Sequence, residues 1–350
     1  MSLMIEVKAE HPYHVTFSGS WASRLNQIQG KRKTVVITSS EVVEHISMMV
    51  QEYDIFLVPD GEHAKDFVTI KKLWDFFESK GIERSDLIVA IGGGSITDLA
   101  GFAAATWLRG IDWVAVPTTL AGMVDASIGG KTGINGVSGK NLIGSFHSPV
   151  EVIIDLALLS TLSDRDFCAG LAEVIKCGLI ADPEILKILN NSSPKILRSA
   201  AGAGSLSEIV RRSIVVKADI VSEDFKEKGA RAFLNYGHTL GHAIEHLSKY
   251  QLRHGEAVAI GLHFAAHLGF KHSGLEQESY LLHRTLLERY GLPVKYDVEL
   301  FEPLLSVMHL DKKSRDGIIR FVLLRAIGYP FLSSDLSETD LRTAYREVMS

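Results

Sequence analysis

The sequence predicts an α/β fold in which a Rossmann-like parallel-sheet domain is followed by a mostly α-helical domain. Short β-rich runs alternate with helical patterns through the first 155 residues, and long helical patterns dominate after residue 158. The length of 350 residues is that of roughly two domains. We therefore place one domain at 1–158 and the other at 159–350.

The expected strands of the first domain are short apolar runs, as strands buried on both faces of a parallel sheet require. They are Thr34–Thr38, Ile55–Val58, Leu87–Ile91, Trp113–Val116 and Val152–Ile154. After residue 158 only Ile318–Leu324 reads as a short strand or hairpin arm.

A glycine run, Gly92-Gly93-Gly94, separates the strand Leu87–Ile91 from a helix expected over Leu99–Leu108. Backbone N–H groups at such a helix start bind phosphate, helped by the helix dipole. An ordinary tight turn is the alternative, because the run is not the GxGxxG dinucleotide fingerprint. The loop is thus a candidate pyrophosphate cradle.

Composition excludes several classes of function. The chain is 46% apolar and 23% charged, and 37 basic against 42 acidic residues leave a net charge of −5 with no basic stripe for nucleic acid. No uncharged apolar run is long enough to cross a membrane, and no signal peptide is evident. With only two cysteines, we expect a reduced, cytoplasmic protein.

Histidines cluster in a pattern that suits a divalent metal. His238 and His242 lie four residues apart, on one face of a helix, with His254 downstream and Glu173 upstream. Two imidazoles and one carboxylate leave an open coordination position, as a catalytic zinc needs. The plain alternative is a solvated surface histidine, which we expect for several of the 14, including His283.

Longer motifs carry a family resemblance. Besides Gly92-Gly93-Gly94 with Asp98, these are Pro117-Thr118-Thr119-Leu120, Gly129-Gly130-Lys131-Thr132-Gly133-Ile134-Asn135, Lys140-Asn141-Leu142-Ile143-Gly144 and Gly237-His238-Thr239-Leu240-Gly241-His242-Ala243-Ile244-Glu245. In order and spacing they resemble the 3-dehydroquinate synthase family of sugar phosphate cyclases, from about residue 60 to residue 328.

The resemblance implies a shikimate-pathway lyase of aromatic amino acid biosynthesis. Its substrate would be a sugar acid phosphate, 3-deoxy-D-arabino-heptulosonate 7-phosphate (DAHP), and its products 3-dehydroquinate and phosphate. The family uses NAD catalytically, with a divalent metal that is zinc first and cobalt as an alternative. NAD transiently oxidises a secondary alcohol, phosphate leaves by elimination, and the hydride then returns. The resemblance also implies a homodimer.

The resemblance assigns roles to individual residues. Glu173, His238 and His254 resemble the metal ligands, which leaves His242 for proton transfer. The positions that match substrate-binding residues are Lys131, Lys140, Asn141, Lys176, Lys217, Arg231 and Asn235, together with Arg109, which would reach a neighbouring subunit's substrate phosphate. A lysine pair, Lys312-Lys313, matches a further substrate contact, and either lysine could make it.

The NAD-binding positions also follow from the resemblance. They are Asp60, Glu62, Lys65, Gly93, Gly94, Ser95, Asp98, Thr118, Thr119, Asp125, Lys131, Lys140 and Thr161. An acidic group beside the ribose repels a 2′-phosphate, so NAD is favoured over NADP. Ser163 and Asp166 depart from the family pattern, at positions that are usually proline and glutamate.

Two alternatives stay open at the level of sequence. The nearer is another sugar phosphate cyclase, of the valiolone or inosose type, whose substrate lacks the carboxylate that Arg231 and Lys217 would bind. The more distant is a metal-dependent alcohol or glycerol dehydrogenase, which would release NADH. A non-catalytic binding module is disfavoured by the number of ionisable groups that converge.

Overall fold

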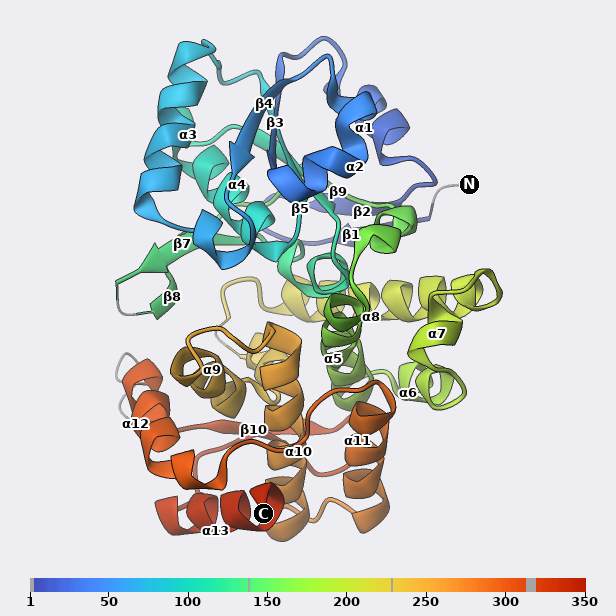
Figure 1. Ribbon diagram of the computed structural model, residues 1–350, viewed down its shortest axis with the longest axis vertical. Helices are drawn as coiled ribbons and strands as arrows, with labels where there is room; N and C mark the ends of the chain where they lie inside the picture. Colours follow the sequence, from blue (N-terminus) through green and yellow to red (C-terminus); the bar gives the residue numbers. More distant parts are fainter. Residues whose placement is uncertain (1–2, 138, 228, 313–318) are drawn as a thin grey trace. The chain divides into compact units, whose positions relative to one another are not determined.

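The computed structural model describes residues 3–137, 139–227, 229–312 and 319–350, and for 311–312 the backbone only (Figure 1). The chain forms two compact units. The N-terminal unit is Met1–Ser163 with Lys217–Lys226, and the helical unit is Asp164–Val216 with Glu227–Ser350. The chain therefore leaves the first unit at 163 rather than at the predicted 158, and returns to it once.

A seven-stranded sheet forms the centre of the N-terminal unit, in the order β1-β2-β9-β6-β5-β3-β4. All neighbouring strands are parallel except β1 and β2, which pair antiparallel. The strands are β1 (Met4–Val7), β2 (Tyr13–Phe17), β3 (Thr34–Ser39), β4 (Asp54–Val58), β5 (Leu87–Gly92), β6 (Asp112–Pro117) and β9 (Glu151–Ile154). The predicted α/β class and its five parallel strands are confirmed.

Helices cover both faces of this sheet, and Figure 1 shows α2 and α3 on opposite sides of the strands. The helices are α1 (Trp21–Gln29), α2 (Ser40–Val50), α3 (Phe67–Ser79) and α4 (Gly94–Thr106). Short helices are η1 (Gly61–Ala64), η2 (Trp107–Arg109), η3 (Gly122–Ala126) and η4 (Leu156–Thr161). The strands β4-β3-β5-β6-β9 give a doubly wound order whose direction reverses between β3 and β5, where ligands bind in such sheets.

Several features of this unit differ from the sequence prediction. Strands β1 and β2 precede the first predicted strand and were not expected. Helix α4 begins at Gly94 rather than Leu99, because Gly93 already serves as its N-cap. A hairpin of β7 (Lys131–Gly136) and β8 (Gly139–Phe146) was not expected, since its glycines and polar residues break the alternation that marks a strand.

One long helix, α8 (Ala203–Glu223), belongs to both units. Its last part packs on the N-terminal unit: Lys217 Nζ lies 2.5 Å from Asp125 Oδ1, and Ser222 Oγ accepts a 2.9 Å hydrogen bond from the Lys8 N–H. Just beyond the helix, the ring of Phe225 lies 5.3 Å from that of Phe146. The sequence does not show this division because the helical pattern runs through it unbroken.

The helical unit is built around α10, whose inner residues are almost all buried. Its helices are α5 (Asp164–Ile180), α6 (Pro183–Asn190), α7 (Pro194–Leu197), the first part of α8, α9 (His238–Leu247), α10 (His254–His272), α11 (Gln277–Arg289), α12 (Phe301–Lys312) and α13 (Glu338–Met349). The unit is completed by the short helices η5 (Ala200–Gly202), η6 (Ala230–Asn235) and η7 (Val298–Leu300) and by the antiparallel pair β10 (Phe321–Leu324) and β11 (Pro330–Ser333). No helix in the described ranges is both long and apolar enough to cross a bilayer.

The expectation that His283 is a solvated surface residue is wrong. His283 is fully buried on α11, where it shares a face with Leu286 and Leu287. Its Nδ1 lies 2.7 Å from the Ser279 carbonyl oxygen and its Nε2 lies 2.9 Å from the Tyr236 hydroxyl. Burial lowers the pKa of this imidazole from 6.5 to about 4, so the ring is neutral at pH 7.

This neutral histidine makes stability depend on pH. Because the pKa is about 4 when folded and 6.5 when unfolded, the unfolded chain binds the extra proton between these values, and stability falls as pH drops through that window. From pH 7 to pH 5 the wild type should lose about 2 kcal/mol more than the His283→Gln variant. Urea unfolding of both proteins at the two pH values measures this, and equal losses would contradict the buried neutral state.

Candidate functional site

Three predicted metal ligands meet in the helical unit. Glu173 lies in the middle of α5, and His238 and His254 are the first residues of α9 and α10. Glu173 Oε1 lies 3.4 Å from His238 Nε2 and 3.3 Å from His254 Nε2, and the three ligand atoms all lie within 4.8 Å of one another. Tetrahedral zinc with bonds of about 2.0–2.1 Å places its ligand atoms about 3.3–3.4 Å apart. The spacing therefore suits zinc.

Hydrogen bonds turn both imidazoles toward the same point. His238 Nδ1 donates to the Tyr236 carbonyl oxygen at 3.1 Å, and His254 Nδ1 lies 3.0 Å from Glu245 Oε2. In its neutral form with the proton on Nδ1, each ring presents an Nε2 lone pair toward Glu173 Oε1, a buried oxygen that accepts no hydrogen bond in the described structure. Three potential electron-pair donors that face one another fit a divalent metal, which would take the place of a proton on His254 Nε2.

Neighbouring charges shift the pKa values of two of the three proposed ligands, Glu173 and His254. Burial alone would raise the pKa of Glu173, but the Lys176 ammonium, which forms an ion pair with Oε2, and His238 hold it well below its usual range. Burial opposes the charged form of His254, yet Glu245 and Glu173 outweigh it and raise the pKa of this ring to about 10. The surroundings thus favour positive charge where the metal is expected.

Glu245 is a further candidate residue of this site that the sequence reasoning missed. Glu245 is buried on α9, seven residues after His238, and its carboxylate bonds His254 Nδ1. A carboxylate in this position fixes the tautomer of a histidine ligand and makes that histidine a stronger ligand. His242, Glu245 and His254 also form a second group with ligand spacing. The missed signal was the helical spacing of His238, His242 and Glu245, which places all three near one face.

Close backbone contacts hold the ligand-bearing helices together. A Cβ at Gly255 would lie 1.8 Å from the Ala169 carbonyl oxygen of α5, and one at Gly261 would lie 1.9 Å from the Gly237 carbonyl oxygen. Gly237 itself has φ +81°, a conformation that side chains other than glycine rarely adopt. The glycines among the histidines therefore let α10 approach both α5 and the start of α9.

The other predicted residues of the helical unit differ in how deeply they are buried. Arg231 is buried in η6, and Asn235 Nδ2 donates to Glu227 Oε1 at 3.0 Å. His242 is exposed, and its ring lies 5.2 Å from that of His238 and 6.1 Å from that of His254. Asp166 pairs with Arg253 at 2.8 Å, an ion pair within the helical unit. Lys313 lies outside the described residues, as does the side chain of Lys312.

In the N-terminal unit, the predicted phosphate loop follows β5, beside the point where the strand order reverses. Gly93 caps α4 without a side chain, and Gly94 and Ser95 form its first turn. Thr118 and Thr119 follow the neighbouring strand β6, and the Thr118 N–H donates to the Gly92 carbonyl oxygen at 2.9 Å. The start of α4 thus has the backbone form of an anion site.

A polar network beside this loop brings together residues that the sequence assigned to NAD or substrate. Lys65, nearly fully buried, lies 2.6 Å from Asp98 Oδ2 and 3.6 Å from Glu62 Oε1, and also bonds Asn141 Oδ1. Lys140 lies 3.6 Å from Glu62. Burial alone would lower the pKa of Lys65, but Asp98 and Glu62 outweigh it and raise it. This lysine therefore remains charged inside the unit.

The remaining predicted residues of this unit are more scattered. Lys217 bonds Asp125, and Asp60 precedes η1 at the end of β4. Thr161 is exposed and bonds only the Leu158 carbonyl oxygen of its own turn, among the described contacts. Lys131 and Arg109 are exposed. Arg109 follows Leu108 in two successive left-handed residues, with φ 67° and 48°.

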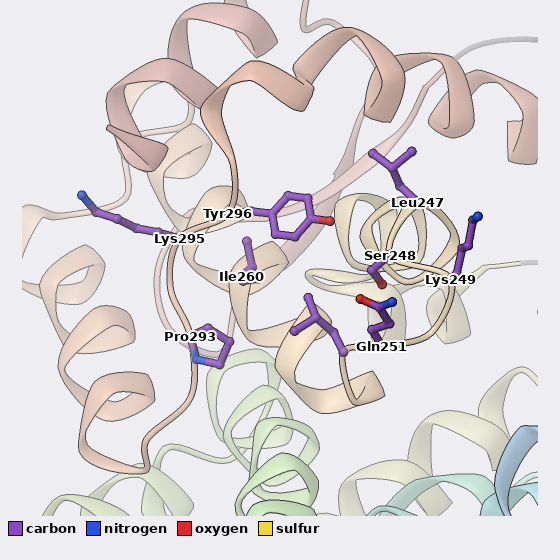
Figure 2. Close-up of a pocket in the computed structure, with 9 residues that line it drawn as sticks. Leu247, Ser248, Lys249, Gln251, Ile260, Pro293, Lys295 and Tyr296 are labelled. Atoms are coloured by element: carbon purple, nitrogen blue, oxygen red, sulfur yellow. The ribbon is translucent and has the colours of Figure 1, made fainter.

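A hollow in the helical unit does not coincide with this chemistry. It has a volume of about 710 Å³ and lies in the helical unit, between the end of α9 and the segment before η7, where Figure 2 shows Lys249, Gln251, Lys295 and Tyr296 around it. None of the predicted ligand, cofactor or substrate residues lines it. We assign the metal group from its donor geometry rather than from the size of this open hollow.

Comparison with known proteins agrees with this architecture. Residues 55–169 match the family model for the 3-dehydroquinate synthase N-terminal domain, and residues 170–314 match the one for its C-terminal domain. The 3-dehydroquinate synthase of Mycolicibacterium gilvum is 44% identical over 352 residues, which cover 98% of each chain.

Solved structures of two cyclases are also similar. The 2-epi-5-epi-valiolone synthase of Streptomyces hygroscopicus, with NAD⁺ and Zn²⁺ bound, has a TM-score of 0.88 and 27% identity over 95% of each chain. A 2-deoxy-scyllo-inosose synthase, complexed with carbaglucose-6-phosphate, NAD⁺ and Co²⁺, has a TM-score of 0.85 and 25% identity over 99% of this chain and 100% of that one. From the family models and the curated relative, this chain belongs to the 3-dehydroquinate synthase family.

Proposed function

We propose that this protein converts DAHP into 3-dehydroquinate and phosphate, with NAD as a catalytic cofactor and zinc as its metal. The observation that carries the proposal is the convergence of Glu173, His238 and His254 through atoms at the spacing of metal ligands. A curated relative of the same name over 98% of the chain, and a structural neighbour that holds NAD⁺ and Zn²⁺, support it.

The residues of the helical unit would hold the metal and bind an anionic substrate. Glu173, His238 and His254 are the ligands, and a bound divalent ion supplies Lewis-acid polarisation of an alcohol or ketone oxygen. Arg231, with its planar fork, suits the substrate carboxylate, and Lys176 adds positive charge. His242, exposed beside the ligands, is placed to exchange a proton with solvent or substrate.

The residues of the N-terminal unit would hold NAD, which supplies reversible hydride transfer. The N–H groups of Gly94 and Ser95 at the start of α4 bind its pyrophosphate, with Thr118 and Thr119 at the neighbouring strand end. Glu62 and Asp98 place carboxylates beside the loop, which favours the ribose hydroxyls of NAD over the 2′-phosphate of NADP. Lys131, Lys140, Asn141 and Lys217 contribute to cofactor or substrate contacts.

Phosphate release from DAHP tests this function directly. We expect turnover with NAD and zinc, background rates after treatment with a chelator or without NAD, and no accumulation of NADH absorbance. Sedoheptulose 7-phosphate and glucose 6-phosphate, which lack the carboxylate, should react at least ~100-fold more slowly, because the charge-assisted hydrogen bonds that Arg231 would make to the carboxylate are lost. Faster release from either one would move the protein to the valiolone- or inosose-forming cyclases, and net NADH would make it a dehydrogenase.

We further propose that the protein is a homodimer in which Arg109 reaches the substrate phosphate of the neighbouring subunit. Two successive non-glycine residues in the left-handed region, Leu108 and Arg109, are strained and commonly mark functional loops. Sedimentation should give a dimer, and Arg109→Ala should raise KM for DAHP without releasing zinc. A monomer of full activity would refute this assignment.

A further inference from the structure

Both the side-chain hydroxyl and the backbone carbonyl of Tyr236 form hydrogen bonds within the helical unit. Its ring is completely buried, and its hydroxyl lies 2.9 Å from His283 Nε2. His283 Nδ1 lies 2.7 Å from the Ser279 carbonyl oxygen, which can only accept, so Nδ1 carries the proton. The Tyr236 hydroxyl must then donate to Nε2. The direction of each hydrogen bond in this pair is therefore fixed.

The same residue orients a proposed metal ligand through its backbone. The Tyr236 carbonyl oxygen accepts the hydrogen bond from His238 Nδ1 at 3.1 Å, which turns Nε2 toward Glu173 Oε1, 3.4 Å away. Only Gly237 separates the two residues, and its carbonyl oxygen packs directly on Gly261 of α10. A shift of the Tyr236 side chain would therefore move the carbonyl that holds His238.

Packing of the apolar core does not by itself account for the polar pair Tyr236 and His283. A phenylalanine at 236 and a leucine at 283 would bury similar apolar surface without desolvating a hydroxyl and an imidazole. What the hydrogen bond adds is a defined position for the tyrosine, and with it a defined tautomer and ring orientation for His238. Outer partners of this kind typically contribute 10–100-fold to metal affinity.

We propose that Tyr236 and His283 are positioning residues of the metal centre. Hydrogen bonds connect them to it in the order His283, Tyr236, His238. This inference rests on the metal site proposed above. Neither residue touches the metal or the substrate. Their contribution is to keep His238 Nε2 aimed at the point where Glu173 and His254 also aim.

Zinc titration of metal-stripped protein, with thermal unfolding measured alongside, tests this proposal. Tyr236→Phe removes the donor, and His283→Asn keeps only a donor near the Nδ1 position, so both should weaken the zinc Kd by roughly 10–100-fold. His283→Gln places an amide oxygen near the Nε2 position, so it should retain most of the affinity. If Tyr236→Phe does not fold, the two His283 variants decide, because both remove the ring and only glutamine restores the acceptor.

A second buried pair offers a matched control. His263 is also buried, with Nδ1 2.9 Å from the Val294 carbonyl oxygen and Nε2 3.3 Å from the Tyr280 hydroxyl, and it makes no described hydrogen bond to a proposed ligand. His263→Asn should lower the unfolding temperature and leave the zinc Kd at its wild-type value. Unchanged zinc binding in Tyr236→Phe and His283→Asn would overturn this inference but leave the proposed metal site standing. Wild-type protein that binds no zinc would overturn the metal site and the inference with it.

Discussion

The Glu173→Gln variant should bind zinc at least ~100-fold more weakly than the wild type, with turnover falling in step with metal occupancy. Glu173 supplies the only negative charge among the three proposed ligands, and its Oε1 is the atom that faces both imidazoles. A glutamine amide removes this charge, and its NH₂ can donate to an imidazole lone pair in place of the cation. The variant also removes the carboxylate from the buried ion pair with Lys176, and breaking a buried pair in this way commonly costs about 3–5 kcal/mol.

A second buried carboxylate separates loss of metal from general loss of stability. Glu151 on β9 forms a bidentate pair with Arg24, with distances of 2.7 and 2.8 Å, in the N-terminal unit. Glu151→Gln should lower stability and leave the zinc Kd unchanged. Zinc titration and thermal unfolding of both variants measure the two effects. Tight zinc binding by Glu173→Gln would show that the cation lies elsewhere.

The second large effect is expected at Gly255, immediately after the proposed ligand His254. An alanine Cβ would lie 1.8 Å from the Ala169 oxygen and 2.5 Å from its carbonyl carbon, and both are backbone atoms. The start of α10 must then move roughly 1 Å away from α5, which carries Glu173, and overpacking of this kind is destabilising. A displacement of that size can reduce catalysis by about 100-fold, so Gly255→Ala should lose most zinc binding and turnover.

Gly204 is the matched control for this substitution. It lies in α8, exposed, with nothing within 4 Å of an added Cβ. Gly204→Ala should therefore keep full zinc binding and at least the wild-type stability, because the added Cβ meets nothing and alanine is the better helix former. Circular dichroism, unfolding temperature and zinc Kd compare the two variants. A Gly255→Ala protein with wild-type values would mean that α5 and α10 are not packed as described.

The sequence predicts the central strands well because their signal is local. Leu87–Ile91 is an unbroken apolar run, and β5 is found at Leu87–Gly92. Helix α4 begins earlier than its apolar pattern, since its first turn is glycine and polar residues that serve the loop rather than the core. The hairpin β7-β8 leaves much of β8 exposed, so no buried face imposes an alternating pattern on it.

The proposed metal ligands could not be identified from local sequence patterns alone. Glu173 is 65 residues before His238, and spacing within a helix links only His238 and His242. Choosing Glu173, His238 and His254 came from the family resemblance, and the structure brings these three together. Glu245 and His283 were missed because each makes its decisive contact with a residue on another helix or turn. Even so, His283 shares the three- and four-residue spacing of Leu286 and Leu287, which indicates a buried face.

The return of α8 to the first unit has a consequence for how the chain folds as it leaves the ribosome. The sheet-bearing unit is encoded first, yet Lys217, Ser222 and Phe225, which bond or pack on it, emerge only after residues 164–216. At roughly 5–20 residues per second, the nascent sheet waits several seconds for its last segment. A fragment cut at Ser163 would remain in that unfinished state permanently.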